Sequence, residues 1–256
     1  RILENAGTLT VSGGTVFFNL GNLGGGAVIN NLAGATLEVQ GEPDFNDNFP
    51  SVSSVNNAGL FRKSGAGETR FGNNAIAFNN TGTVEITGGS LGIEAGCTNN
   101  GRIEVAAGAV FAMKSGTVTT GPAAEHAGDG TFSLQGATLT LSEPATFPNL
   151  AFTTGTLRGT ATVTATNTFS WTGGIMRDAG KTLISSGATA TISGGNNKDL
   201  SANRILENAG TLTVSGGTVF FNLNNFGGGA VINNLAGATF EVLGETDFSH
   251  NFATVS

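Results

Sequence analysis

The sequence predicts an all-β protein that folds as a right-handed parallel β-helix, or β-solenoid. Three observations predict this fold class. The composition is rich in turn-forming and β-branched residues, a long stretch of sequence returns after 203 residues, and a shorter pattern recurs about every 25 residues within that repeat. Repeats of this length are typical of proteins in which each repeat is one structural unit that stacks on its neighbours.

The composition favours strands and argues against several functions. The chain has 256 residues, of which 41 are Gly, 18 are Phe and only 11% are charged. A hydrophobic content of 39% is too high for a disordered Gly-rich linker. A net charge of −7 without any basic run argues against a nucleic-acid partner. No apolar run approaches the roughly 20 residues that a membrane-spanning helix needs.

The long repeat predicts the domain organisation. Residues 1–53 align with residues 204–256 without a gap, and 44 of the 53 positions are identical. We therefore expect residues 1–203 to be one tandem solenoid unit and residues 204–256 to be the first quarter of the next, with no linker. A chain that starts in the middle of a repeated unit is expected to be an excerpt of a longer array.

The shorter pattern predicts the rungs of the solenoid. An Asn precedes a Gly, and an alternating strand follows, so that successive strands begin in the same way. Strict alternation of apolar and polar residues indicates a half-buried strand. Counting the Gly of each phrase gives about eight rungs per unit. The clearest phrases are at residues 4–11, 30–39, 56–63, 79–86 and 99–105.

Stacking these rungs makes predictions about individual residues. Strands of neighbouring rungs should lie ~4.8 Å apart. The Asn residues should form a hydrogen-bonded ladder at one corner, and the Gly residues should supply the positive φ of the turns. Residues expected in one inward file are Val11, Val39, Ile86, Val105 and Leu134, and residues expected in one outward file are Thr10, Glu38, Arg62, Glu85 and Glu104.

These rungs resemble the β-helical repeat regions of large bacterial surface and secreted proteins. The residues that carry the resemblance are INNLAGATLEV at 29–39, FNNTGTVEI at 78–86 and the segment Phe169–Gly195. Filamentous-haemagglutinin-like adhesins and autotransporter passenger domains are the groups most similar in this respect. The resemblance implies an extracellular or cell-surface location and roles in adhesion, matrix or filament formation.

The outward file contains one candidate catalytic pair. Glu85 and Glu104 are expected on neighbouring rungs, and glycoside hydrolysis uses two carboxyl groups at that scale. The alternative is a solvated face on which Arg102 relieves the repulsion between the carboxylates. We favour this alternative, because the flanking outward positions are Thr and Ser and the chain has no Tyr.

A loop at residues 41–51 is the best candidate for contacts with partners. It interrupts the rung pattern, and its close oxygen ligands raise the alternative of a Ca²⁺ site. The second copy replaces Asp47 by His250, which argues against a dedicated metal site. We expect a solvated contact loop whose contact residues are Glu42, Asp44, Phe45, Asp47 and Phe49.

The remaining reactive residues predict no catalytic centre and no cofactor. His126 with Asp129 and Ser133 has the residue types of a catalytic triad, but no nucleophile-elbow sequence accompanies them. Cys97 is the only cysteine, and we expect it to be a buried core thiol. Trp171 is expected in the core rather than on a sugar-binding surface.

The sequence therefore predicts a structural module of an extracellular fibre and not an enzyme. Self-association into fibres or bundles is the expected partnership, with surface glycans or matrix as further partners. Two alternatives stay open: the stalk of a ligand-binding cell-surface adhesin, and a carbohydrate-active β-helix enzyme. Binding to a glycan would favour the first, and polysaccharide cleavage that depends on Glu85 or Glu104 would favour the second.

Overall fold

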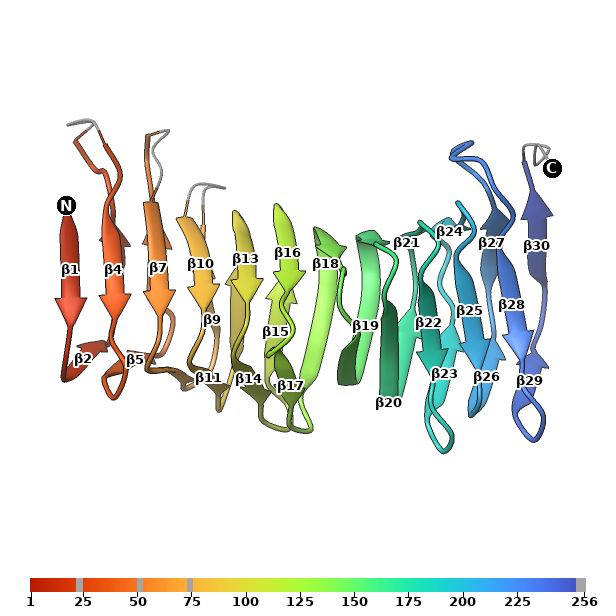
Figure 1. Ribbon diagram of the computed structural model, residues 1–256, viewed down its shortest axis with the longest axis horizontal. Coiled ribbons are helices and arrows are strands. Elements are labelled where there is room, and N and C mark those ends of the chain that lie inside the picture. The colour runs from red at the N-terminus through yellow and green to blue at the C-terminus, as the bar shows by residue number, and fades with distance from the viewer. Residues whose placement is uncertain (22–24, 50–52, 73–75, 252–256) are drawn as a thin grey trace. The chain divides into compact units, whose positions relative to one another are not determined.

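The computed structural model describes residues 1–21, 25–49, 53–72 and 76–251, and these residues form thirty strands and no helix (Figure 1). The described residues accordingly hold no helical segment suited to crossing a membrane. Neighbouring rungs pair through parallel strands, as a β-solenoid requires. The predicted fold class is thus confirmed, while the right hand of the helix and the count of eight rungs remain predictions.

The chain divides into two compact units, Arg1–Phe132 and Ser133–Ser256. The division falls within β18 (Thr131–Thr140) and inside the first 203-residue repeat. The compact units therefore do not coincide with the repeats of the sequence, and the two units are described separately.

The first unit consists of short strands in three parallel files. One file runs through β1, β4, β7, β10, β13 and β16, which lie side by side in Figure 1. The second is the six-stranded sheet β2, β5, β8, β11, β14 and β17, and the third contains β3, β6, β9, β12 and β15. The strands are β1 (Ile2–Asn5), β2 (Thr8–Val11), β3 (Thr15–Phe17), β4 (Val28–Asn31), β5 (Thr36–Gln40), β6 (Asp44–Asn46), β7 (Ser53–Asn57), β8 (Leu60–Ser64), β9 (Glu68–Phe71), β10 (Ile76–Asn80), β11 (Thr83–Ile86), β12 (Ser90–Ile93), β13 (Gly96–Asn99), β14 (Arg102–Val105), β15 (Val110–Met113), β16 (Thr117–Thr120) and β17 (Glu125–Ala127).

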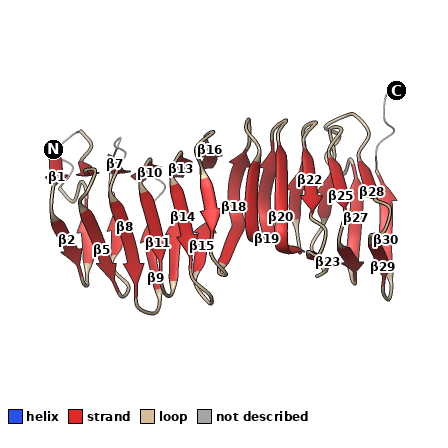
Figure 2. Ribbon diagram, turned by 60° about the horizontal axis from the view of Figure 1, so that its bottom comes forward, coloured by secondary structure: helices blue, strands red, loops and turns tan. Residues whose placement is uncertain are grey.

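The second unit has the same organisation after two longer strands, β19 (Ala145–Arg158) and β20 (Thr162–Trp171). From there, parallel files run through β22, β25 and β28, through β23, β26 and β29, and through β24, β27 and β30. Figure 2 shows that all of these elements are strands joined by loops. Their bounds are β21 (Gly174–Met176), β22 (Lys181–Ile184), β23 (Thr189–Ile192), β24 (Lys198–Leu200), β25 (Ile205–Asn208), β26 (Thr211–Val214), β27 (Gly217–Phe221), β28 (Val231–Asn234), β29 (Thr239–Val242) and β30 (Thr246–His250).

Aromatic side chains fill the core of each unit. In the first unit the Phe45 and Phe71 rings stack at 4.8 Å, and Phe71 stacks on Phe78 at 5.0 Å. In the second unit Trp171 is fully buried, as the sequence predicted, and lies parallel to Phe152 at 6.2 Å. Such pairs contribute ~0.5–1.5 kcal/mol each beyond the burial of their area. Like side chains on successive rungs therefore hold the stack together from inside.

The corner glycines differ from the prediction. Of the phrase glycines, only Gly34 and Gly159 have positive φ. The nine phrase glycines are Gly7, Gly34, Gly59, Gly82, Gly101, Gly130, Gly159, Gly180 and Gly210. At Gly59, Gly82 and Gly210 a Cβ atom would instead collide with a backbone carbonyl oxygen of the preceding rung. Gly is needed at these corners because successive rungs approach closely there, and not because the turn is left-handed.

The inward file is confirmed in part and corrected at two positions. Val11 pairs with Val39, and Ile86 pairs with Val105. Between Val39 and Ile86, however, the file contains Lys63. Leu134 does not continue the file after Val105, because β14 pairs with β17 and not with the strand that contains Leu134. Leu134 lies in β18, which pairs with β15 and therefore belongs to a different file.

Candidate functional site

The predicted outward file is present on the six-stranded sheet of the first unit. Thr10 registers with Glu38, and Arg62 registers with Glu38 on one side and Glu85 on the other. Glu85 in turn registers with Glu104. The alternation of the strands directs these side chains away from the core, so that residues far apart in sequence form one charged column.

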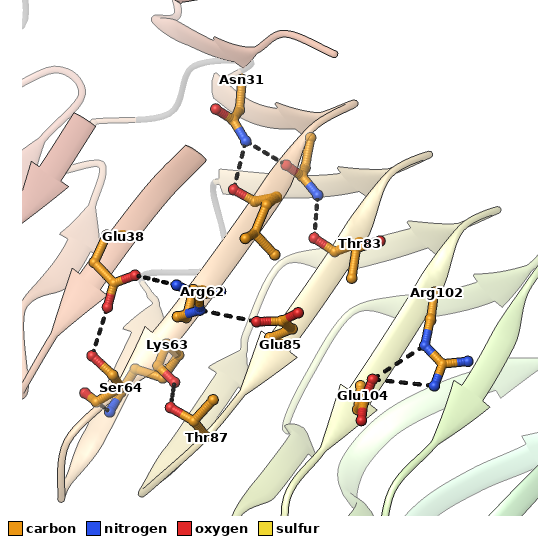
Figure 3. Close-up of polar contacts among 12 residues, drawn as sticks. Asn31, Glu38, Arg62, Lys63, Ser64, Thr83, Glu85, Thr87, Arg102 and Glu104 are labelled. Atoms are coloured by element: carbon orange, nitrogen blue, oxygen red, sulfur yellow. Dashed lines mark hydrogen bonds and ion pairs between the residues drawn. The ribbon is translucent and has the colours of Figure 1, made fainter. Parts of the chain in front are cut away.

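Arginines pair with each carboxylate of this column. Arg62 donates from Nε to Glu85 at 2.9 Å, and its Nη1 lies 3.6 Å from Glu38 (Figure 3). The hydrogen bond to Glu85, together with its charge and that of Glu38, raises the pKa of Arg62. Glu85 therefore accepts a hydrogen bond from the guanidinium of Arg62, while Glu38 forms an ion pair with it and accepts its hydrogen bond from the Ser64 hydroxyl at 2.8 Å.

Arg102 relieves the contact between like charges, as the sequence predicted. It donates to Glu104 at 3.1 Å and to Glu125 at 3.0 Å, and these bonds raise its pKa. Figure 3 shows Arg102 turned toward Glu104, while Glu85 is turned toward Arg62. The two carboxylates of the candidate catalytic pair are thus held by different arginines, in the pattern of an ion-paired surface.

A second polar column, the Asn ladder, is buried at one corner. Each Asn donates from Nδ2 to Oδ1 of the Asn on the following rung, and all of these bonds run in the same direction along the chain. The ladder is predicted by the sequence, although none of its members has positive φ. Its bonds are Asn5 to Asn31 at 2.8 Å, Asn31 to Asn57 at 2.7 Å, Asn57 to Asn80 at 2.8 Å, Asn80 to Asn99 at 2.8 Å, and, in the second unit, Asn208 to Asn234 at 2.7 Å.

The ladder in the first unit ends on His126. Asn99 already accepts through Oδ1 from Asn80, so its Nδ2 faces Nε2 of His126 at 3.4 Å. The ring of His126 also meets Phe132 edge-on at 5.3 Å. In register, however, Thr120 follows Asn99 in this column, whereas His126 registers with Ile103 in the six-stranded sheet. The last Asn of the ladder therefore contacts a side chain of the neighbouring strand file, which sequence reasoning missed.

The middle of the predicted contact loop at residues 41–51 is a strand of the solenoid. Asp44–Asn46 form β6, and Phe45 is fully buried between aromatic rings, which corrects the expectation of a loop at these positions. Asp44 pairs with Arg70 at 2.6 Å. Asp44 and Phe45 point to opposite faces of β6, as successive residues do in any strand, so the ring enters the core while the carboxylate stays outside it.

The rest of that segment has two environments. Asp47 is buried and accepts from the Ser53 hydroxyl at 2.5 Å and from the Phe49 amide at 3.3 Å. Glu42 is exposed and Phe49 is half-buried. Pro50 and Ser51, which belong to the predicted loop, lie outside the described residues. Throughout the described part of the chain, no three His, Cys, Asp or Glu side chains gather as metal ligands would.

Two buried lysines were not predicted as sites. Lys63 is fully buried, and its Nζ donates to the carbonyl oxygens of Ser64 at 3.1 Å, Gly65 at 3.0 Å and Gly88 at 3.3 Å. Burial lowers the pKa of Lys63. The signal in the sequence is a lysine at an inward position directly before a Gly-rich turn, because such a turn exposes carbonyl oxygens that can surround an ammonium group.

The second unit contains a matching lysine and a buried arginine. Lys198 donates to the carbonyl oxygens of Gly194 at 3.0 Å and Asn196 at 2.9 Å, and burial lowers its pKa. Arg204 is fully buried and donates to the Thr182 hydroxyl at 3.0 Å. Burial lowers the pKa of Arg204 to about 10. These cations connect successive turns of the solenoid.

Cys97 is buried, as predicted, and burial raises its pKa to about 12. Its thiol is therefore protonated at neutral pH and is a poor nucleophile. No family model, no curated protein and no solved structure matches this chain.

Proposed function

We propose that this chain is a structural module of an extracellular fibre of the bacterial surface type and that it has no catalytic role. One observation carries the proposal: like side chains stack on successive rungs in charged, amide and aromatic columns. A scaffold made of such columns is lengthened by adding rungs, because each rung contacts only its neighbours. The near-identical repeat at an offset of 203 residues fits that use.

The ion-paired glutamates and the buried lysine of the first unit support the same proposal. Glu85 and Glu104 are paired with arginines, and Lys63 is bound by carbonyl oxygens of turns. Arg62 connects its rung with that of Glu85, and Arg102, which pairs with Glu104 in its own strand, also connects with Glu125 on the next rung. Lys63 reaches the carbonyl oxygen of Gly88 in the next turn. The carboxylates that could have formed a hydrolytic pair thus have a structural use that explains their positions.

The extracellular location and the partners follow from the resemblance to bacterial adhesins and passenger domains. A surface with few charges and many Thr, Asn and Gly side chains suits lateral packing of one fibre on another. Surface glycans or matrix are further partners that such a polar face would suit. Glu42 and the half-buried Phe49 are the accessible members of the proposed contact segment.

Electron microscopy of the protein isolated from its source tests this proposal. We expect thin fibres, and with about eight rungs per repeat at ~4.8 Å each, an axial repeat of roughly 38 Å. Compact particles without an axial repeat would contradict a fibre. A polysaccharide-cleaving activity that disappears in Glu85→Gln would contradict the non-catalytic role.

A further inference from the structure

Three paired strands in the interior of the second unit carry a regular set of hydroxyl groups. β20, β23 and β26 pair in parallel, so that Thr168, Thr189 and Thr211 form one row across the rungs. Two residues further along each strand, a second row runs beside the first. We call the six residues of these two rows the hydroxyl lattice: Thr168, Ser170, Thr189, Thr191, Thr211 and Thr213.

The alternation of the strands directs the lattice away from the core. All six residues are exposed or half-buried, while the residues between the two rows are buried, namely Phe169, Ala190 and Leu212. The Thr168 hydroxyl donates to Asn149 at 2.9 Å. The other five hydroxyls form no hydrogen bond with any residue that the structure describes. Most of the lattice is therefore free to bond to a ligand.

The charge of this face restricts the kind of partner. β26 is the repeat equivalent of β2, and the charged column begins only on the rung that follows it, here at Glu241 beside Thr213. A hydroxyl group is neutral and both donates and accepts hydrogen bonds. Charge complementarity thus favours an uncharged partner whose own surface donates and accepts. Phe169 and Trp171 of β20 are buried, so these strands offer no aromatic platform on which a sugar ring could stack.

The spacing of the lattice is close to that of ice. Neighbouring strands lie ~4.8 Å apart, and alternate residues of one strand lie ~6.6 Å apart. In water, hydrogen bonds of ~2.75 Å at the tetrahedral angle place second-neighbour oxygens ~4.5 Å apart and repeat the puckered layers every ~7.3 Å. Measured from the centre of the lattice, the mismatch is ~0.3 Å across the rungs and ~0.4 Å along the strands. Hydrogen bonds can therefore form over the whole lattice.

We propose that the hydroxyl lattice binds the surface of ice. Five of its six members are threonines, which are β-branched and stiff at χ1, so that few side-chain conformations are lost when the hydroxyls bond to an ordered layer of water. The lattice is regular in two directions, as ice is, whereas a single polysaccharide chain is regular in one. The inference adds a ligand to the proposed fibre and does not depend on the fibre function.

Partition of the 256-residue chain between slowly grown ice and the remaining liquid tests the proposal. We expect the wild type to be enriched in the ice. Thr191→Lys places a charge and a longer side chain on the central strand β23 of the lattice, and we expect it to lower the ratio of protein in ice to protein in liquid at least tenfold. Thr98→Lys is the matched control, because Thr98 is an exposed threonine of β13 in the first unit, and it should partition like the wild type.

Circular dichroism of the three proteins shows whether they are equally folded, and the coarsening of small ice crystals held just below the melting point gives a second readout. The wild type and Thr98→Lys should slow the coarsening, and Thr191→Lys should not. A wild type that stays in the liquid would overturn the proposal, as would equal partition of the wild type and Thr191→Lys. Retention on powdered cellulose that Thr191→Lys abolishes, without partition into ice, would assign the lattice to a neutral polysaccharide instead. Fibres in the source material without affinity for ice would remove this inference and leave the fibre function standing.

Discussion

Asn57 takes part in three hydrogen bonds at the middle of the buried ladder. It accepts from Asn31 at 2.7 Å and donates to Asn80 at 2.8 Å and to the Thr83 carbonyl at 2.9 Å. Asn57→Ala leaves buried donors and acceptors on both neighbouring rungs without partners, each at a cost of ~1–3 kcal/mol. We expect urea denaturation to show a loss of about 3 kcal/mol in the free energy of unfolding.

Asn56 provides the control one position earlier. It belongs to a half-buried outer ladder, where it donates to Asn30 at 2.9 Å and accepts from Asn79 at 2.9 Å. Because water can replace its bonds, Asn56→Ala should cost no more than about 1 kcal/mol. Equal losses for the two variants would contradict the importance of burial in the ladder.

Lys63 should make the stability depend on pH in the alkaline range. Its pKa is lowered in the folded protein from the ordinary value of 10.5, so the unfolded chain binds the proton more tightly. The energetic penalty of the buried charge is complete below the lowered pKa and is relieved as the pH rises toward 10.5. We expect the free energy of unfolding of the wild type to rise across this window relative to Lys63→Met.

The measurement is a series of urea denaturation curves for both proteins between neutral pH and pH 10.5. Lys181→Met is the control, since Lys181 forms a surface ion pair with Glu207. A difference between wild type and Lys63→Met that stays constant with pH would show that the Lys63 ammonium is not penalised by burial.

At the corners between strands, the equivalent glycines Gly7 and Gly210 of the two repeat copies have different neighbours. A Cβ at Gly210 would collide with the Ala188 carbonyl oxygen, while a Cβ at the equivalent Gly7 would meet nothing within 4 Å. Neither residue has positive φ. In the chain of residues 1–256 studied by itself, we expect Gly210→Ala to cost about 2–3 kcal/mol, in the range of overpacked sites, and Gly7→Ala to cost no more than ~0.5 kcal/mol.

Thermal or urea unfolding of the two variants measures this difference directly. The substitution and the neighbouring sequence are the same in both, so intrinsic strand propensity cancels. If Gly7→Ala were as damaging as Gly210→Ala, the glycines would be required for backbone conformation and not for the close approach of rungs.

The strands of the six-stranded sheet were predictable because alternation and stacking together determine their register. The prediction of Glu38, Arg62, Glu85 and Glu104 as one column is correct at every step. The corners were less predictable, since they differ in length from rung to rung. A corner of different length placed Leu134 in the wrong file. The turn-forming residues around β6, which include Gly41, Pro43 and Asp47, gave this short strand the composition of a loop.

Lys63 and the end of the ladder at His126 show a second limit of sequence reasoning. An inward lysine contradicts the apolar pattern unless the carbonyl oxygens that surround it are known, and one of these belongs to Gly88, 25 residues after Lys63. His126 contacts the last Asn of the ladder from the neighbouring strand file, where it registers with Ile103, and no local sequence pattern indicates that contact. Contacts between rungs decide both cases, and such contacts are not visible in one rung alone.

For the chain of residues 1–256 studied by itself, the stacking predicts a gradient of local stability. Among the described residues, β1–β3 and β28–β30 have a paired neighbour on one side only, whereas interior strands such as β8 and β11 have two. In a one-dimensional stack, opening therefore starts at the rungs with one neighbour. We expect amide hydrogen exchange to be fastest in these outer rungs and slowest in β7–β14 and β22–β26.

Hydrogen exchange read by mass spectrometry after proteolysis resolves this gradient. Repeat-equivalent peptides provide the control, since residues 2–11 and 205–214 have the same sequence and the same intrinsic exchange rate. The second peptide should be the better protected of the two. Equal protection would mean that each unit opens as a single cooperative block.

The shared register of the two copies also bears on how such a gene can change. Since residues 204–256 offer the same strand pattern as residues 1–53, recombination between copies would add or remove 203 residues at a time. Every junction produced in this way reproduces a junction that the protein already contains. The length of the protein can therefore diverge between lineages, while the contacts inside it stay under the same selection.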